Sequence, residues 1–183
     1  MSASVNDLEI RAATEADVEV LFDLILELAA YEKLSDEVSG DAEVLRRSLF
    51  EEKAAEALLL ETSDGTAVGY AIFFTTFSTF ECRSGIWLED VYVRPEHRRG
   101  GIGRAVMEHL AQLARERGHV RLEWVALEWN EPALSFYAKL GAQRLDDWKI
   151  LRLEQDGIRR LAEAAGGASA DEGGVSGEAP PAA

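Results

Sequence analysis

The sequence has little cysteine, histidine or lysine and no long apolar run. Its 183 residues include one cysteine, Cys82, so no disulfide can form within the chain and we expect a reducing, cytoplasmic location. The three histidines are scattered without the spacing of metal ligands, so no metal site is expected. No cationic segment precedes an apolar stretch, and no stretch approaches ~18 apolar residues, so we expect no signal peptide and no membrane partner.

Basic residues are outnumbered by acidic ones. The chain has 19 Lys and Arg against 34 Asp and Glu, a formal net charge of -15. Nucleic acid is not expected as a partner, because its binding depends on Lys and Arg that neutralise phosphates. The negative charge suits a cationic ligand, but it is equally typical of a salty habitat or a GC-rich genome. The charge therefore excludes one class of partner without selecting another.

Hydrophobic residues make up 47% of the chain, and their spacing predicts alternating strands and helices. Strands are expected at 8–13, 56–62, 67–76, 86–93, 120–127, 142–145 and 148–153, and helices at 15–31, 41–50, 102–117 and 130–140. The central strands follow one another through turns, and the later ones alternate with helices. This order predicts a mixed sheet of the α/β or α+β class rather than a fully parallel one. We expect an α/β fold with a mixed, mostly antiparallel central sheet and helices on both faces.

The composition predicts a single domain over residues 1–163. The Ala- and Gly-rich stretch 164–183 has too few large apolar side chains to bury a face, and it is expected to be a disordered tail.

The segment 86–107 (IWLEDVYVRPEHRRGGIGRAVM) is the most informative part of the chain. A strand leads into a loop of Arg and Gly, and a helix follows. Glycines in the loop allow several backbone N–H groups to converge, and the helix start adds further donors. A diphosphate fits such a site best, and an ordinary surface turn is the alternative. The phosphate-binding motif G-x-x-x-x-G-K-[ST] is absent, and the dinucleotide motif lacks its third glycine.

The motif Arg98-x-x-Gly101-x-Gly103 resembles the acyl-CoA signature of the GCN5-related N-acetyltransferase (GNAT) superfamily. Three further stretches resemble its spermidine/spermine (diamine) acetyltransferase-like branch, which includes the thialysine acetyltransferases. They are LAAYE at 28–32, LED at 88–90 and EWNEPALSFY at 128–137. The resemblance implies the acetyl-CoA N-acyltransferase fold, acetyl-CoA as co-substrate without a metal, and a homodimer.

The same resemblance implies roles for particular residues. Tyr137 corresponds to the general acid of the family. The backbone of residues 91–93 would hold the pantetheine arm of the cofactor, and the Arg/Gly loop would hold its diphosphate. The expected cofactor-binding residues are Val91, Tyr92, Val93, Arg98, Arg99, Gly100, Gly101, Ile102, Gly103, Arg104 and Asn130, and the expected substrate-binding residues are Tyr31, Glu32, Glu89, Asp146 and Trp148.

Elementary chemistry agrees with an amine substrate. An alkyl ammonium has a pKa of ~10.4, so deprotonating it at pH 7 costs roughly 4.6 kcal/mol. Glu89, within a strand, is the best-placed carboxylate to take this proton through a water molecule. Its neighbour Asp90 is expected on the opposite face with a structural role. Other acidic contacts are expected to hold a second cation, which favours a diamine, a polyamine or a lysine-like amino acid.

The amine is expected to attack the thioester directly in a ternary complex, so Cys82 is not needed as a nucleophile. The four tryptophans are expected mostly in the core or in groove walls, and Tyr137 also fits a core position. Two further hypotheses remain open. One is acetylation of a protein or peptide amine or of an aminoglycoside, and the other is a non-catalytic CoA-binding sensor.

Overall fold

The computed structural model describes residues 7–98 and 100–167. They divide into a first unit up to Asn130 and a second unit from Glu131 onward. Arg99, one of the expected diphosphate ligands, lies outside the described residues, as does the stretch 168–183 of the predicted tail. The prediction of one domain over residues 1–163 stays a prediction.

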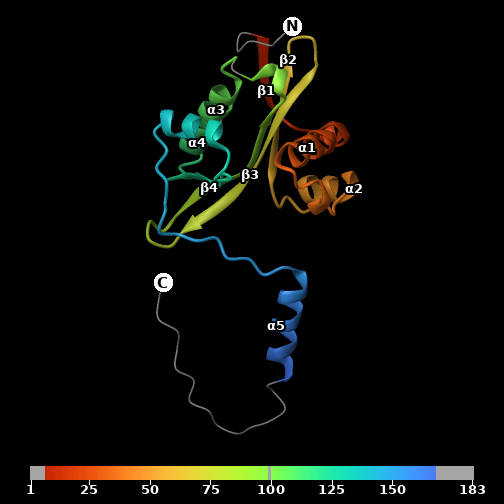
Figure 1. Ribbon diagram of the computed structural model, residues 1–183, viewed down its shortest axis with the longest axis vertical. Coiled ribbons are helices and arrows are strands. Elements are labelled where there is room, and N and C mark those ends of the chain that lie inside the picture. Colours follow the sequence, from red (N-terminus) through yellow and green to blue (C-terminus); the bar gives the residue numbers. More distant parts are fainter. Residues whose placement is uncertain (1–6, 99, 168–183) are drawn as a thin grey trace. The chain divides into compact units, whose positions relative to one another are not determined.

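Five strands of the first unit form one sheet in the order β1-β2-β3-β4-β5 (Figure 1). The first three pairs are antiparallel and the last is parallel, which confirms the predicted mixed, mostly antiparallel sheet. The strands are β1 (Leu8–Ala12), β2 (Glu56–Thr62), β3 (Ala67–Ser78), β4 (Arg83–Val93) and β5 (Leu122–Trp124).

Helices cover both faces of this sheet, as predicted (Figure 1). The helix α1 (Val18–Glu32) contacts β3 and β4 on one face, with α2 (Ala42–Arg46) beside it. The helix α3 (Ile102–Glu116) contacts β4 on the other face. Short turns complete the unit: the 3-10 turns η2 (Glu15–Asp17), η3 (Ser35–Glu37) and η5 (Pro95–His97), and the π turn η4 (Arg47–Glu51).

The apolar stripes of these helices explain why they lie on the sheet. Leu21 and Leu24 of α1 are fully buried against Leu59, Tyr70 and Tyr92 of the strands. On α3, the buried residues recur at helical spacing, whereas the residues between them are mostly exposed. The buried set of α3 is Ile102, Val106, Met107, Leu110 and Ala114.

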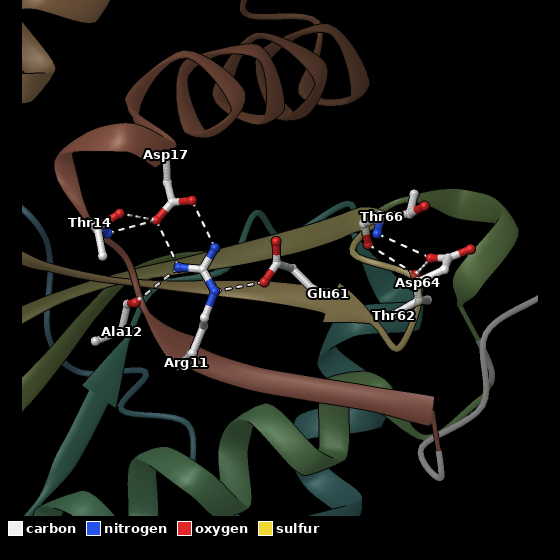
Figure 2. A network of polar contacts seen from close by, with 8 residues as sticks. All are labelled: Arg11, Ala12, Thr14, Asp17, Glu61, Thr62, Asp64 and Thr66. Carbon is white, nitrogen blue, oxygen red and sulfur yellow. Dashed lines mark hydrogen bonds and ion pairs between the residues drawn. The ribbon is translucent and has the colours of Figure 1, made fainter.

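An arginine on β1 fixes the start of α1 (Figure 2). Arg11 donates from Nη1 and Nη2 to the two carboxylate oxygens of Asp17, at 2.7 and 2.8 Å, and from Nε to Glu61 Oε2 of β2 at 2.6 Å. Asp17 also accepts the backbone N–H of Thr14 at 2.7 Å, so the pair caps the start of this helical segment. These bonds, the guanidinium first, hold the pKa of the Asp17 carboxyl well below its usual range.

A second arginine ties α1 to the end of β4. Arg94 donates from Nη2 to Glu27 Oε1 at 2.6 Å and from Nε to Glu27 Oε2 at 3.0 Å. Its Nη1 group donates to the carbonyl oxygen of Ala67 on β3 at 2.8 Å. The hydrogen bonds from Arg94 are the main reason that the pKa of Glu27 is lowered. The C-terminal half of α1, which carries two expected substrate residues, is thereby held over the sheet.

The segments after β4 differ from the sequence prediction in several places. β5 has three residues, fewer than the predicted strand 120–127. The predicted strands 142–145 and 148–153 are wrong for the described chain, where neither segment is paired. An alternating pattern marks a segment that can pair, but it does not supply the hydrogen-bonding neighbour.

The second unit contains two helices, α4 (Glu131–Lys139) and α5 (Gln155–Gly167). α4 confirms the helix predicted at 130–140. The sequence reading missed α5, which continues past the predicted start of the tail at residue 164. Of the helices that the structure describes, none has the length and apolar character to cross a membrane.

Candidate active site

A β-bulge in β4 shapes the candidate site. Ile72 of β3 lies opposite Asp90, and the register then shifts by one residue, which leaves Glu89 as the extra residue of the bulge. In a bulge, two residues of one strand oppose a single residue of its partner, so the regular alternation of side chains is broken. The prediction that Glu89 and Asp90 point to opposite faces assumed a regular strand, and it fails here.

Both carboxylates lie on the face that α1 covers. Ile72 belongs to the core under α1, so its partner Asp90 shares this face. Phe74, two residues further along β3, also shares it and pairs with Trp87. The indole Nε1 of Trp87 donates to Glu89 Oε2 at 2.9 Å, which holds the carboxylate of Glu89 on the same side.

Burial and neighbouring charges raise the pKa of Asp90 above that of an ordinary aspartate. The hydroxyl of Tyr70, which is fully buried, donates to Asp90 Oδ2 at 3.2 Å. Burial is the first cause that raises the pKa of Asp90 to about 6, and the charges of Glu89 and Glu32 add to it. Burial also raises the pKa of Glu32, the last residue of α1. We call Glu32, Glu89 and Asp90 the acidic cluster.

The strand β4 has a free edge beyond its short pairing with β5. β5 pairs only with residues 86–88 of β4, so in the described chain residues 89–93 have no strand neighbour on that side. The backbone N–H of Arg94 donates to the carbonyl of Val68 on β3 at 2.9 Å. Because neighbours alternate, Val93 and Val91 direct their backbone groups to the free edge, as the pantetheine prediction requires. Tyr92 between them turns its backbone to β3, and its hydroxyl bonds with Glu27.

The loop after β4 ends in a left-handed residue that starts α3. Gly101 has φ 85° and ψ -1°, a conformation that glycine adopts without strain, and among the described residues no side chain caps the helix. The first N–H groups of α3 therefore have no acceptor within the helix, which is the arrangement expected for binding a diphosphate. The side chain of Ile102 is buried, so only its backbone can serve. Arg104 is exposed and donates to Glu108 at 2.8 Å.

Arg98 connects this loop to the end of α1. Its Nε group donates to the carbonyl oxygen of Val93 at 2.7 Å, on the free edge of β4. Its guanidinium carbon lies 4.4 Å from the centre of the Tyr31 ring and 5.6 Å from that of Tyr92. The Tyr31 ring also lies 6.2 Å from the ring of Trp129, at an angle of 50°.

The remaining predicted residues divide between the two units. Asn130 ends the first unit, where its N–H donates to the carbonyl of Leu127 at 2.9 Å. Tyr137 lies half-buried in α4, with its ring 5.2 Å from that of Phe136. Asp146 accepts from Arg144 at 3.1 Å, and the exposed Trp148 follows in the same turn.

The structure thus brings Tyr31, Glu32 and Glu89 together with two residues that the sequence reading did not select. Asp90 was expected to be structural, and the bulge brings Glu89 to its face, so that both carboxylates belong to the acidic cluster. Trp129 was expected in the core or a groove wall, and at 54% exposed beside Tyr31 it lies at the surface and not in the core. Its polar neighbours Glu128 and Asn130 are the signal in the sequence that argued against burial.

A sheet that opens beside β4, followed by a glycine turn and a helix start, defines the acetyl-CoA N-acyltransferase fold. Residues 24–142 match the model of the acetyltransferase (GNAT) family, so the chain belongs to this family and is an acetyltransferase.

Relatives with assigned activities are similar over most of the chain. A thialysine N-epsilon-acetyltransferase from Bos taurus is 39% identical over 164 residues, which cover 84% of this chain and 96% of the relative. One from Caenorhabditis elegans is 33% identical over 87% of this chain and 99% of the relative. Among solved structures, an integron cassette protein from the mobile metagenome of V. cholerae has a TM-score of 0.70 and 24% identity, covering 86% of this chain and 98% of that one, which supports the fold.

Proposed function

We propose that the protein transfers the acetyl group of acetyl-CoA to a primary amine of a small diamine, a polyamine or a lysine-like amino acid such as thialysine. The observation that carries this proposal is the acidic cluster, which gathers Glu32, Glu89 and Asp90 on one face of β4. The names of the relatives in cattle and nematode support an amine acceptor.

The cofactor would bind along the free edge of β4. Backbone groups of Val91 and Val93 hydrogen-bond the pantetheine arm, as a neighbouring strand would. The diphosphate meets the N–H groups after Gly101 and the guanidinium groups of the loop. Asn130 contacts the cofactor from the start of the next helix.

The acidic cluster would accept the amine in its charged form. A carboxylate beside the reacting nitrogen stabilises the ammonium and opposes attack, so most of the negative charge serves a second, distal cation. Glu89 is exposed and oriented by Trp87, so it can take the proton of the reacting nitrogen through a water molecule and release it to solvent. Tyr31, Asp146 and Trp148 complete the proposed contacts with the substrate.

The acetyl group would move in one displacement within the ternary complex. The free amine attacks the thioester carbonyl, and backbone N–H groups of β4 stabilise the oxyanion. As the new C–N bond forms and the C–S bond breaks, Tyr137 gives its proton to the leaving thiolate. A phenol with an ordinary pKa of ~10 is protonated at neutral pH and so has a proton to donate, and the proton that the nitrogen loses as the amide forms restores the balance.

An assay of thiol release over a panel of amines tests this function. The panel contains thialysine, lysine, ornithine, putrescine, spermidine and spermine, with a monoamine of similar length as control. We expect the dicationic or polycationic amines to be acetylated faster than the monoamine. Acetylation of none of them would refute the substrate class. Mass spectrometry of peptide and aminoglycoside reactions tests the alternative acceptors, and retained CoA binding without any turnover would indicate a sensor.

We further propose a homodimer in the cytoplasm, as the resemblance to the diamine acetyltransferase branch implies. The single cysteine supports a reducing location.

A further inference from the structure

A cation already occupies the aromatic surface at the end of α1. The guanidinium of Arg98 stacks on Tyr31, with 4.4 Å between the guanidinium carbon and the ring centre. A cation over an aromatic face is attracted by the negative π-system, as an alkyl ammonium would be. Tyr31 and Trp129 are both partly exposed, at 37% and 54%, so their rings can also receive a cation from solvent.

The bonds of Arg98 leave it able to move toward a phosphate. Its Nε group is bonded to the carbonyl of Val93, and its two Nη groups make no hydrogen bond within residues 7–98 and 100–167. Over the same residues, Arg98 forms no ion pair with a carboxylate. Charge-assisted hydrogen bonds to a phosphate are stronger than a stacking contact on a partly exposed ring.

We propose that Arg98 couples the two substrate sites: it covers Tyr31 in the free protein, and the diphosphate of the cofactor draws it away, so that the cation of the amine substrate binds between Tyr31 and Trp129. This inference rests on the proposed function, because it needs the cofactor at the glycine loop and the amine beside Glu32. Arg98 is a positioning residue here, and Trp129 is an additional residue of the cation site.

The coupling between cofactor binding and amine binding is expected to be positive, and it can be measured. Because binding free energies are reciprocal, the cofactor increases the affinity for the amine by the same factor as the amine increases the affinity for the cofactor. Removing a cation–π contact from a partly exposed ring corresponds to about a two- to five-fold change in an equilibrium constant. The coupling factor is expected in this range.

Calorimetric titration of the full chain tests the proposal, with thialysine and, in a parallel series, spermidine as amines. Each amine is titrated with and without saturating coenzyme A, which carries no acetyl group and allows no turnover. In the unmodified protein we expect coenzyme A to tighten amine binding about two- to five-fold. In Arg98→Ala, the amine should bind the free protein more tightly than it binds the unmodified protein, and the effect of coenzyme A should disappear.

Four variants separate coupling from general damage. Arg104→Ala removes a cation of the same loop that does not touch Tyr31, so it should weaken coenzyme A binding and leave the amine affinity of the free protein unchanged. Tyr31→Phe keeps the aromatic ring, so the coupling should remain. Tyr31→Leu removes the ring that Arg98 covers, so adding Arg98→Ala to this variant should no longer tighten the binding of the amine. Trp129→Leu should weaken the binding of the amine without weakening the binding of coenzyme A.

Two results would overturn the inference in distinguishable ways. If the amines are acetylated but Arg98→Ala leaves amine binding to the free protein unchanged or weaker, the coupling is wrong and the proposed function stands. If neither amine binds even with coenzyme A, the substrate class is wrong and the inference falls with it. A thermal melt of each variant identifies any that fail to fold. If Arg98→Ala is among them, the effect of coenzyme A on amine binding is compared between Tyr31→Phe and Tyr31→Leu, and an equal effect in both would overturn the coupling.

Discussion

At the scale of single residues, Asp90 is the carboxyl of the acidic cluster whose pKa is raised to about 6. A carboxyl with a pKa of about 6 is half-ionised only at about pH 6, where an ordinary aspartate is already almost fully charged. Its burial, its Tyr70 hydrogen bond and the nearby charges of Glu89 and Glu32 come from the packing of β4 against β3 and α1. The ionised form of Asp90 therefore lowers the stability of the folded protein, and such perturbed carboxyl groups are common at functional sites.

Replacing Asp90 by Asn should stabilise the protein in a pH-dependent way. The pKa of Asp90 is raised from 3.8 to about 6 on folding, so ionisation disfavours the folded state as the pH rises through this range. We expect Asp90→Asn to gain up to about 3 kcal/mol in the free energy of unfolding at pH 7.5 and about 1 kcal/mol at pH 4.5. Urea denaturation at both pH values measures this, and a gain independent of pH would contradict it.

Replacing Glu89 by Gln should slow the reaction most at neutral pH. The amide can still accept the hydrogen bond from Trp87, but it cannot take the proton of the amine. We expect kcat/KM to fall about 100-fold at pH 7 and less at pH 9, where more of the amine is already neutral. Glu43→Gln, which removes an exposed carboxylate paired with Arg46, is the control and should leave the rate unchanged. An equal loss at both pH values would argue against a proton acceptor.

Replacing Tyr137 by Phe should separate catalysis from binding. The ring remains beside Phe136, but the proton for the leaving thiolate is missing. We expect kcat to fall about 100-fold or more, with the dissociation constant of coenzyme A unchanged. Steady-state kinetics and calorimetry on the same preparation measure both. An active Tyr137→Phe enzyme would remove this residue from the mechanism.

At the scale of elements, α1 is the part that carries the proposed amine-binding residues Tyr31 and Glu32, and two arginines fix it. Arg11 bonds Asp17 before its first turn, and Arg94 bonds Glu27 in its later half. Both pairs are partly shielded from solvent, so they are worth more than the ion pairs of the exposed helix surfaces. The position of Tyr31 and Glu32 over β4 depends on this double attachment.

Replacing Asp17 by Asn should weaken the attachment of α1 and reduce the loss of stability as the pH falls. The Arg11 and Thr14 hydrogen bonds lower the pKa of Asp17, so its stabilisation is complete above the ordinary pKa near 3.8 and is lost as the pH falls below it. We expect Asp17→Asn to lose about 1–3 kcal/mol at pH 7. Denaturation curves at pH 7 and pH 3 measure the change, with Asp156→Asn as an exposed control. An undiminished stability at pH 7 would show that the network contributes nothing.

At the scale of the whole molecule, the proposed homodimer has a direct signature. One chain has a mass of 20.1 kDa, so light scattering coupled to gel filtration should give about 40 kDa for a dimer. The same column run at falling protein concentration gives the strength of association. A mass that stays at that of one chain at every concentration would refute the dimer.

Most of the fold was readable from local patterns. The strand β2 coincides with its predicted range, and α3 and α4 agree with theirs within two residues, because each depends on its own periodicity and on its turn or cap residues. The predicted strands 142–145 and 148–153 failed because pairing requires a partner, which no local pattern provides. The helix α5 was missed because its Ala- and Gly-rich end is typical of an unfolded tail.

The sequence by itself determined the acetyltransferase family, the glycine loop before α3 and the types of residue at the proposed amine site, since these depend on motifs and their order along the chain. Only the tertiary structure decided which side chains meet. The bulge turned Glu89 and Asp90 to one face, and the packing of α1 on the sheet set Arg98 on Tyr31. Register and helix packing join residues far apart in the chain, and the spacing of residues within one strand or helix carries no information about them.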